Sequence, residues 1–325
     1  MEENTEQRVD LTLFSEKIQE LKDRIASVIV GQEQTVDLVL TAILANGHVL
    51  IEGVPGVAKT LLARLTARLI DADFSRIQFT PDLMPSDVLG TTVFNMKTNG
   101  FDFHQGPIFA DIVLVDEINR APAKTQAALF EVMEERQISI DGTTHRMGDL
   151  YTILATQNPV EQEGTYKLPE AQLDRFLMKI TMDYPSLEEE VNILERHHTN
   201  AALVKLDDIT PAITKEELLS LRAFMNQVFV DRTLLQYIAL IVQQTRTSKA
   251  VYLGASPRAS VAMLQSSKAY ALLQGRDFVT PEDIKFVAPY VLQHRLILTA
   301  EAEMEGYSPV KVTQRLICLL YTSPS

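Results

Sequence analysis

The chain has 325 residues, of which 46% are hydrophobic and 22% charged, a composition typical of a soluble globular protein long enough for two domains. The formal net charge of −13 disfavours nonspecific attraction to DNA or anionic lipid, so we expect no nucleic-acid partner. The single cysteine, Cys318, excludes an internal disulfide framework. The acidic N-terminal sequence does not resemble a signal peptide, and the apolar run from Leu38 to Ile51 is too short and polar to cross a bilayer, so we expect a cytoplasmic protein.

Apolar residues recur at helical spacing from Phe14 to Ile29 and predict an amphipathic helix. From His48 onward the pattern changes to short apolar runs, with helical segments at 61–69 and 124–135 among them. The runs occupy residues 48–53, 75–80, 111–117, 151–158 and 176–182. This alternation predicts an α/β domain with a mostly parallel, five-stranded sheet covered by helices on both faces.

Two further segments of this region predict β-hairpins. Residues 91–107 contain an Asn-Gly turn at 99–100, and residues 137–147 contain an Asp-Gly turn at 141–142. Both dipeptides are typical of tight turns between antiparallel strands.

The remainder of the chain carries helix signals. Ser186 followed by Glu189 forms a capping box that starts one helix, and Thr280–Asp283 starts another with a cap residue, a proline and two acids. Between them lie three more helical stretches, near 215–230, 231–245 and 257–274. We therefore place a domain boundary near residue 185, with an α/β domain at 1–185 and an all-α domain at 186–325.

The segment Gly53–Thr60, GVPGVAKT, nearly matches the phosphate-binding pattern G-x-x-x-x-G-K-[ST]. It follows an apolar strand and precedes a helix, where backbone N–H groups and the positive helix end can bind an anion. Lys59 would neutralise phosphate charge, and the Thr60 hydroxyl would ligate Mg²⁺. Ala58 replaces the second glycine of the pattern. Because Ala58 immediately precedes the helix, we expect ordinary helical backbone angles there and a functional loop.

Polar side chains follow two other predicted strands. The run at 111–117 ends in Asp116 and Glu117. Because burying a lone carboxylate is costly, we expect these acids to have a functional partner. Asp116 can hold Mg²⁺ through water, and Glu117 can polarise an attacking water. Asn158 follows the next strand and can contact the γ-phosphate or that water, since strand ends of such sheets point into the ligand crevice. A solvent-facing strand end and a simple turn are the alternatives for the acids and for Asn158.

Two arginines complete this predicted site. Arg258 lies just inside the start of a predicted helix, where the helix dipole favours anions, so a nearby phosphate explains it better than the helix does. Arg175 lies in the segment LPEAQLDRF. The alternative for Arg175 is an ordinary ion pair with Asp174 or Glu170.

These motifs, in this order, resemble those of the AAA+ ATPases, and in detail those of the MoxR family. The resemblance covers residues from about 12 to about 310. The matching segments are VGQ at 30–32, GVPGVAKT at 53–60, LVDEINRAP at 114–122, ATQNP at 155–159, LPEAQLDRF at 168–176 and GASPR at 254–258.

The resemblance implies an AAA+ P-loop αβα sandwich followed by a helical lid, assembled into a ring that is usually a hexamer. Its cofactors would be ATP and Mg²⁺, with Asp116 and Glu117 as the Walker B pair, Asn158 as sensor 1, Arg175 as the arginine finger reaching a neighbour's ATP, and Arg258 as the sensor 2 arginine. The hairpin at 91–107 would face the ring pore. The nucleotide-binding residues would be Val30, Gly31, Gln32, Gly53, Val54, Pro55, Gly56, Val57, Ala58, Lys59, Thr60, Leu61 and Asp116.

Members of this family act as chaperone-like remodellers that help to mature partner complexes or insert their cofactors, often together with von Willebrand factor A-domain proteins. The resemblance therefore implies an ATP-hydrolysing remodeller with such a partner and a client complex. Two other functions stay open at this point: a nucleotide-dependent binding switch with little turnover, and a helicase-like DNA motor, which the net charge disfavours.

Overall fold

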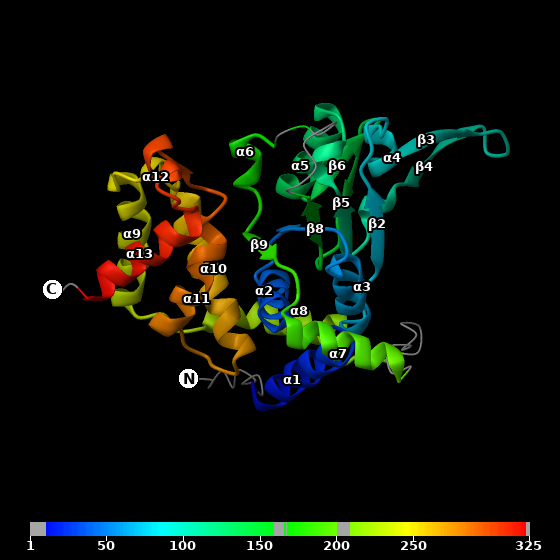
Figure 1. Cartoon of the computed structure of the whole chain (residues 1–325). Helices are drawn as coiled ribbons and strands as arrows, with labels where there is room; N and C mark the ends of the chain where they lie inside the picture. Colours follow the sequence, from blue (N-terminus) through cyan, green and yellow to red (C-terminus); the bar gives the residue numbers. More distant parts are fainter. Residues whose placement is uncertain (1–10, 159–165, 167, 200–208, 323–325) are drawn as a thin grey trace, which may run out of the picture.

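The computed structural model describes residues 11–158, 166, 168–199 and 209–322. At its centre is a five-stranded sheet of order β2-β5-β8-β1-β9, in which all neighbouring strands are parallel (Figure 1). Its strands are β1 (Val49–Gly53), β2 (Phe74–Gln78), β5 (Ile112–Asp116), β8 (Thr152–Gln157) and β9 (Met178–Met182). Each of the five predicted runs coincides with one of these strands, with β2 beginning one residue before its run, at Phe74, so the predicted sheet is confirmed.

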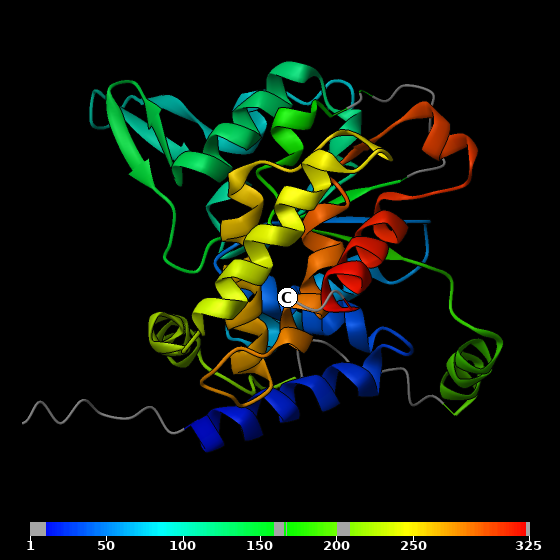
Figure 2. The ribbon, with the colours of Figure 1, turned by 90° about the vertical axis from the view of Figure 1, so that its left-hand side faces the viewer.

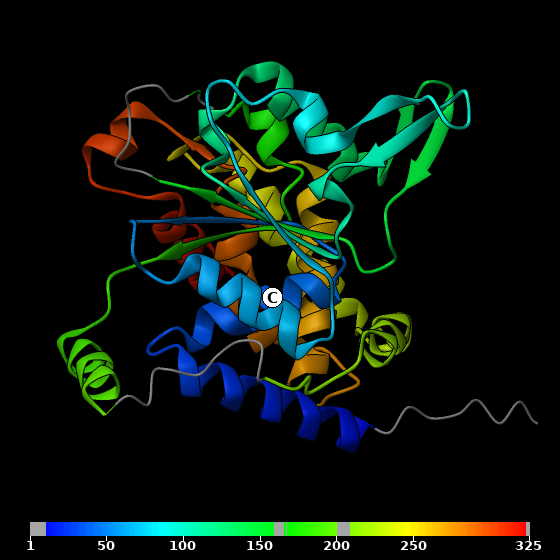
Figure 3. The ribbon, with the colours of Figure 1, turned by 90° about the vertical axis from the view of Figure 1, so that its right-hand side faces the viewer.

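Both faces of the sheet are buried because side chains alternate along each strand. On β5, Ile112 and Leu114 join one apolar core, whereas Val113 and Val115 join the other. The first core includes side chains of α1, α2 and α3, and the second includes side chains of α5; Figure 3 shows α1 beneath the sheet. These helices are α1 (Leu11–Val28), α2 (Glu33–Leu44), α3 (Lys59–Leu69) and α5 (Ala123–Glu135).

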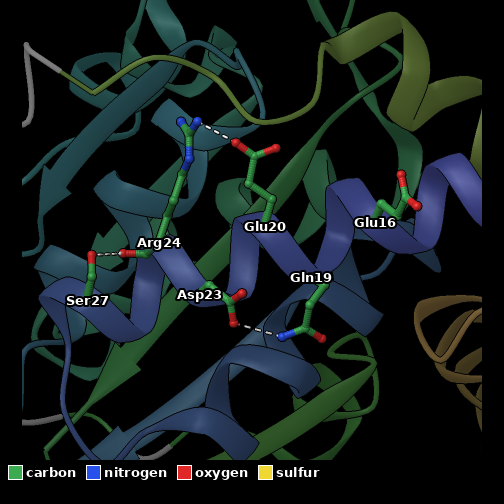
Figure 4. A pocket seen from close by; sticks show the side chains of 6 residues that line it. All are labelled: Glu16, Gln19, Glu20, Asp23, Arg24 and Ser27. Carbon is green, nitrogen blue, oxygen red and sulfur yellow. Dashed lines mark hydrogen bonds and ion pairs between the residues drawn. The ribbon is translucent and has the colours of Figure 1, made fainter.

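Helix α1 is amphipathic, as its spacing predicted. Leu21 and Ile25 are fully buried, while the opposite face carries polar side chains along a shallow surface hollow (Figure 4). On that face Gln19 donates to Asp23 at 2.8 Å, and Arg24 pairs with Glu20. Such contacts between residues four apart give a solvated helix face modest support.

Both predicted hairpins are present. Strands β3 (Gly90–Asn95) and β4 (Gly100–Gln105) follow the short helix α4 (Pro85–Leu89) and project from the body in Figure 1. Strands β6 (Gln137–Ile140) and β7 (Thr143–Arg146) turn at the predicted Asp-Gly pair. The first turn differs from the prediction: Asn95 pairs with Gly100, so the connection is the four-residue loop 96–99, and Gly100 belongs to β4. Only Asn99 of that predicted pair lies in the turn, with a φ of 50°.

A helical unit follows, and Figure 2 shows it in front of the sheet. Helix α10 packs on both α2 and α11, and side chains of this helical unit share a core with those of α1, α2 and α3. Besides its helices, the unit contains one short antiparallel pair of strands. No helix in the described ranges is long and apolar enough to cross a bilayer. The elements are α9 (Arg232–Thr247), β10 (Val251–Leu253), α10 (Pro257–Leu273), α11 (Pro281–Leu292), β11 (Ile297–Leu298), α12 (Ala300–Met304) and α13 (Pro309–Thr322).

Two helices connect the sheet to this unit: α7 (Leu187–His198) and α8 (Lys215–Phe224). The predicted capping box at the start of α7 is present. Helix α8 is held against the part of the chain that contains the sheet, because Lys215 Nζ lies 2.5 Å from Asp111 Oδ1 and Arg222 donates to the backbone oxygen of Asp149 at 2.6 Å. The boundary near residue 185 stays a prediction, and these contacts associate α8 with the part of the chain before it.

Candidate nucleotide-binding site

The predicted phosphate loop connects β1 to α3 at the carboxyl edge of the sheet. Gly56 has a φ of 89°, and Ala58 follows with φ 61° and ψ 24° before α3 begins at Lys59. A left-handed residue followed by helical residues turns successive N–H groups toward one point and forms an anion-binding concavity. The Lys59 ammonium donates to the Gly53 carbonyl oxygen at 2.5 Å and so lies back across the loop. The loop is therefore shaped for an anion.

The backbone at Ala58 corrects one expectation. We predicted ordinary helical angles, but the residue is the N-cap of α3 in the left-handed region. A Cβ in that region costs about 1–2 kcal/mol, because it crowds the following carbonyl oxygen. Glycine would suit this position better than alanine does, so the alanine is tolerated against its backbone preference.

Asp116 and Glu117 lie together at the end of β5. Strand β8 lies between β5 and β1, the strand that leads into the phosphate loop. The Thr156 hydroxyl on β8 donates to Asp116 Oδ1 at 3.2 Å, and the Glu117 backbone N–H donates to that hydroxyl oxygen at 3.0 Å. Glu117 itself has a φ of 57°. Left-handed angles at non-glycine residues are costly, and they cluster at functional sites where the surrounding structure maintains them.

The structure brings the predicted lysine and acids into one site. Burial lowers the pKa of Lys59, and the negative charges of Asp116 and Glu117 oppose that shift by favouring the protonated amine. Lysine and carboxylates thus interact across the carboxyl edges of β1 and β5, where a parallel sheet binds its ligands.

Three residues of the site were missed in the sequence. Arg76 on β2 pairs with Asp116, with 2.6 Å between Nε and Oδ2. Gln78, also on β2, donates to Glu117 Oε2 at 3.1 Å, and Arg120 lies 3.0 Å from the same oxygen. The order of the strands was needed to find the first two, because only the β2–β5 pairing sets alternate side chains of β2 beside these acids.

Asn158 follows β8 directly and is buried, with 6% of its surface exposed. It therefore lies at the same sheet edge as Asp116, since β8 pairs in parallel with β5. Pro159, the last residue of that motif, lies outside the described residues.

The predicted adenine segment, Val30–Gln32, forms the turn between α1 and α2. Gly31 has a φ of 73°, and a Cβ there would lie 2.2 Å from a carboxylate oxygen of Glu189.

Arg175 and Arg258 meet at a different place, on Glu134 of α5. Arg175 follows the short helix α6 (Glu170–Leu173) and lies 2.7 Å from Glu134 Oε2; Arg258, near the start of α10, lies 3.3 Å from Glu134 Oε1. The alternative ion pair of Arg175 with Asp174 or Glu170 is therefore not the one formed. Asp174 instead pairs with the buried Arg295 at 2.6 Å. Within the described residues, both arginines are paired with Glu134 rather than with the loop or the β5 acids.

The side chains present fit a magnesium nucleotide. Mg²⁺ prefers oxygen ligands, and it commonly takes one or two from protein and the others from phosphates and water. The Thr60 hydroxyl in the first turn of α3 and the Asp116 carboxylate supply such oxygens, while the left-handed turn at Ala58 turns N–H groups toward the phosphate position.

Known proteins share this architecture. Residues 48–178 match the model of the AAA family, ATPases associated with various cellular activities, and residues 243–316 match an AAA lid domain. The chain is 48% identical over 295 residues to the uncharacterized protein YeaC of Bacillus subtilis, covering 91% of each chain. It is 45% identical over 302 residues to the chaperone MoxR1 of Mycobacterium tuberculosis, covering 90% of this chain and 79% of the relative. The chain belongs to the MoxR family of AAA+ ATPases.

A solved structure extends the MoxR-family assignment to three dimensions. The crystal structure of a candidate ATPase from Cytophaga hutchinsonii matches with a TM-score of 0.87 at 41% identity, covering 95% of each chain. The family predicted from the sequence motifs is confirmed, and so is the predicted combination of αβα sandwich and helical lid.

Proposed function

We propose that this MoxR-family protein hydrolyses ATP to ADP and phosphate at the carboxyl edge of its sheet. The observation that carries the proposal is that Lys59, Asp116 and Glu117 lie near one another at this edge. The two carboxylates raise the pKa of the lysine, against the lowering effect of its burial. This arrangement of a cation, two carboxylates and an anion-binding loop serves phosphoryl transfer better than it serves stability, because Ala58 and Glu117 both have costly left-handed backbone angles.

In this mechanism Lys59 moves from the Gly53 oxygen to the phosphates, and the loop N–H groups bind the same oxygens. Thr60 and Asp116 would hold Mg²⁺, which supplies neutralisation of phosphate charge. Gln78 and Arg120 both contact Glu117 Oε2, which leaves Oε1 to orient water and take its proton. The water oxygen bonds to the γ-phosphorus, the bond from that phosphorus to the bridging oxygen breaks, and ADP leaves with that electron pair.

We further propose that the active form is a ring, usually six-membered in this family, in which Arg175 acts on a neighbour's nucleotide. The ion pairs support this, since Arg175 and Arg258 are held on α5 and not at their own chain's Lys59. Two cations held together on one face suit the phosphate of an adjacent subunit. Specific activity should then rise with protein concentration as subunits assemble.

The proposed biological role is chaperone-like remodelling of a client complex, with maturation or cofactor insertion as its result and a von Willebrand factor A-domain protein as a partner. Four large apolar side chains on the β3–β4 hairpin support contact with another protein: Val93, Phe94, Met96 and Phe101 are 46%, 47%, 88% and 74% exposed. Phe94 and Phe101 lie against each other across the hairpin, with 5.2 Å between their ring centroids, and exposed apolar side chains grouped in this way mark interaction sites. A cytoplasmic location stays a prediction.

Glu117→Gln tests the enzymatic proposal, with Glu131→Gln, an exposed residue of α5, as the control. The Glu117 variant should bind ATP as the wild type does but turn over roughly 10²–10⁴ times more slowly, the usual contribution of a general base. A variant with wild-type turnover would remove Glu117 from the mechanism. Wild-type protein that binds ATP without turnover at any concentration would make it a binding switch.

A pull-down from cell extract with the ATP-trapped Glu117→Gln protein tests the role. A client should be retained with ATP and lost when Phe94 and Phe101 are both replaced by serine, while ATP binding persists. Retention of the same proteins by the serine variant would move the client site away from the hairpin. DNA-stimulated hydrolysis that weakens with salt would instead favour a nucleic-acid motor.

A further inference from the structure

Glu134 binds both arginines of the predicted site, Arg175, predicted to reach a neighbour's nucleotide, and Arg258, the predicted sensor 2 residue. Its two carboxylate oxygens are divided between them, with Arg175 at Oε2 and Arg258 at Oε1. Arg175 belongs to the nucleotide-binding half and Arg258 to the lid, so one carboxylate connects the halves of the chain.

The same face of α5 supports Arg175 a second time. Phe130, one helical turn before Glu134, lies under the guanidinium, with 5.9 Å from its centre to the ring centroid. Residues four apart on a helix share a face, which explains how one helix supplies both contacts. The Arg175 side chain is 28% exposed, whereas that of Arg258 is 64% exposed. Arg258 therefore depends more on Glu134 for its position.

The backbones that carry the two arginines are joined separately. Asp174, which precedes Arg175, accepts a hydrogen bond from the Ser256 hydroxyl at 3.3 Å and from Arg295 Nε at 2.6 Å. Ser256 is the N-cap of α10, two residues before Arg258. Asp174 thus sets the start of α10 beside α6, and Glu134 then brings the two head groups together.

We propose that Glu134 is a positioning residue that holds Arg175 and Arg258 as one pair for the phosphate of an adjacent subunit. The carboxylate offsets the repulsion between the two guanidinium groups, which would otherwise move apart, and the triad keeps a net positive charge for an anion. Preorganised charges of this kind lower a barrier because they need no rearrangement during reaction. This inference rests on the proposed ATP hydrolysis.

The kinetic test compares Glu134→Gln with Glu135→Gln, the exposed next residue of the same helix. In assembled full-length protein, Glu134→Gln should lower kcat about tenfold and leave the KM for ATP within about twofold, because an interaction needed only at the transition state is lost. Glu135→Gln should match the wild type. Equal rates for the two variants, or a faster Glu134 variant, would overturn the proposal.

A double variant separates positioning from a structural role. In an Arg258→Ala background, Glu134→Gln should lower the rate by less than its effect in the wild type, since residues acting through one another are not additive. Full additivity would show that Glu134 acts elsewhere. Sedimentation velocity on the same samples confirms that assembly is unchanged.

NMR resonances of the arginine Nε–H groups, recorded on nucleotide-free full-length protein, test the ion pairs without requiring turnover. Those of Arg175 and Arg258, assigned with lysine variants, should both shift in Glu134→Gln and stay in place in Glu135→Gln. If neither shifts, the triad is absent in solution and the inference fails. If both shift but wild-type protein never hydrolyses ATP, the proposed function fails and the ion-pair triad stands.

Discussion

The two cationic parts of the candidate site are constructed differently. Lys59 lies at the start of a helix, on a loop between a buried strand and that helix, and its acidic neighbours end another buried strand. Arg175 instead follows the short helix α6, Arg258 is the second residue of the lid helix α10, and both are positioned by ion pairs to Glu134. Sheet backbone cannot shift without breaking the core, whereas exposed ion pairs are worth only about 0–1 kcal/mol and can be exchanged for another anion. The first part is suited to hold a nucleotide and the second to engage and release one.

The largest expected effect separates these parts directly. Arg175→Ala should leave ATP binding intact and lower hydrolysis in the assembled protein by about 10³–10⁵-fold, the range for arginine fingers supplied between subunits. Mixing this variant with Glu117→Gln provides the control. Some activity should return, because mixed rings contain interfaces with an intact arginine and an intact glutamate. No recovery in demonstrably mixed rings would place Arg175 in its own subunit's site.

Lys59→Ala should act on binding itself. Removing the ammonium takes away the positive charge that would contact the phosphates. Phosphate binding should therefore weaken by at least about 100-fold, or about 2.7 kcal/mol, which is in the range for one hydrogen bond to a charged group. A fluorescent ATP analogue measures this, with Lys124→Ala, an exposed residue at the start of α5, as the control. Equal affinity in the two variants would remove the loop from the site.

Acid should lower the stability of the folded chain, because two buried histidines, His48 and His294, stay neutral in it. Burial lowers the pKa of His48 to about 3, and its two ring nitrogens bond the Met133 oxygen and the Ile153 N–H. Burial also lowers the pKa of His294, which contacts the Phe176 oxygen beside Arg175. The unfolded chain takes up these protons below about pH 6.5 while the folded chain does not, so acid lowers the stability of the folded chain. For His48 the loss should be about 1.4 kcal/mol per pH unit between about pH 6.5 and pH 3.

Urea unfolding at a series of pH values measures that slope. His48→Gln should be less stable at pH 7 but flatter between pH 6 and 4, whereas His104→Gln, at an exposed position on β4, should keep the wild-type slope. An unchanged slope for His48→Gln would mean that another group titrates.

The smallest expected effect concerns the loop backbone. Ala58→Gly should raise the free energy of unfolding by about 1 kcal/mol, because glycine has no penalty at positive φ, and ATP binding should persist. Ala63→Gly, within α3, should lower the free energy by about 1 kcal/mol or more, because glycine is unfavourable in a helix interior. If both changes destabilise, the left-handed angle at Ala58 is wrong.

Much of this molecule was predictable from local pattern. Runs rich in apolar residues identified all five sheet strands. The central strand β5 is buried at every position because both of its faces are covered, whereas the edge strand β2 also carries the exposed polar residues Arg76 and Gln78. The capping box at Ser186 and the Asp-Gly turn of the second hairpin were equally local. The phosphate loop and the β5 acids were recognised from residue types and spacing alone, since phosphate binding requires them in a fixed order.

Only the tertiary structure decided the rest. The strand order β2-β5-β8-β1-β9 places Arg76 and Gln78 beside the acids, although they lie about 40 residues away in the chain. Glu134 meets two arginines from separate segments, and no spacing indicates that. The backbone at Ala58 was mispredicted because the surrounding structure can impose an angle that the residue disfavours. Residue chemistry and periodicity are local properties of the sequence, whereas ion pairs and strain depend on which distant segments the fold brings together.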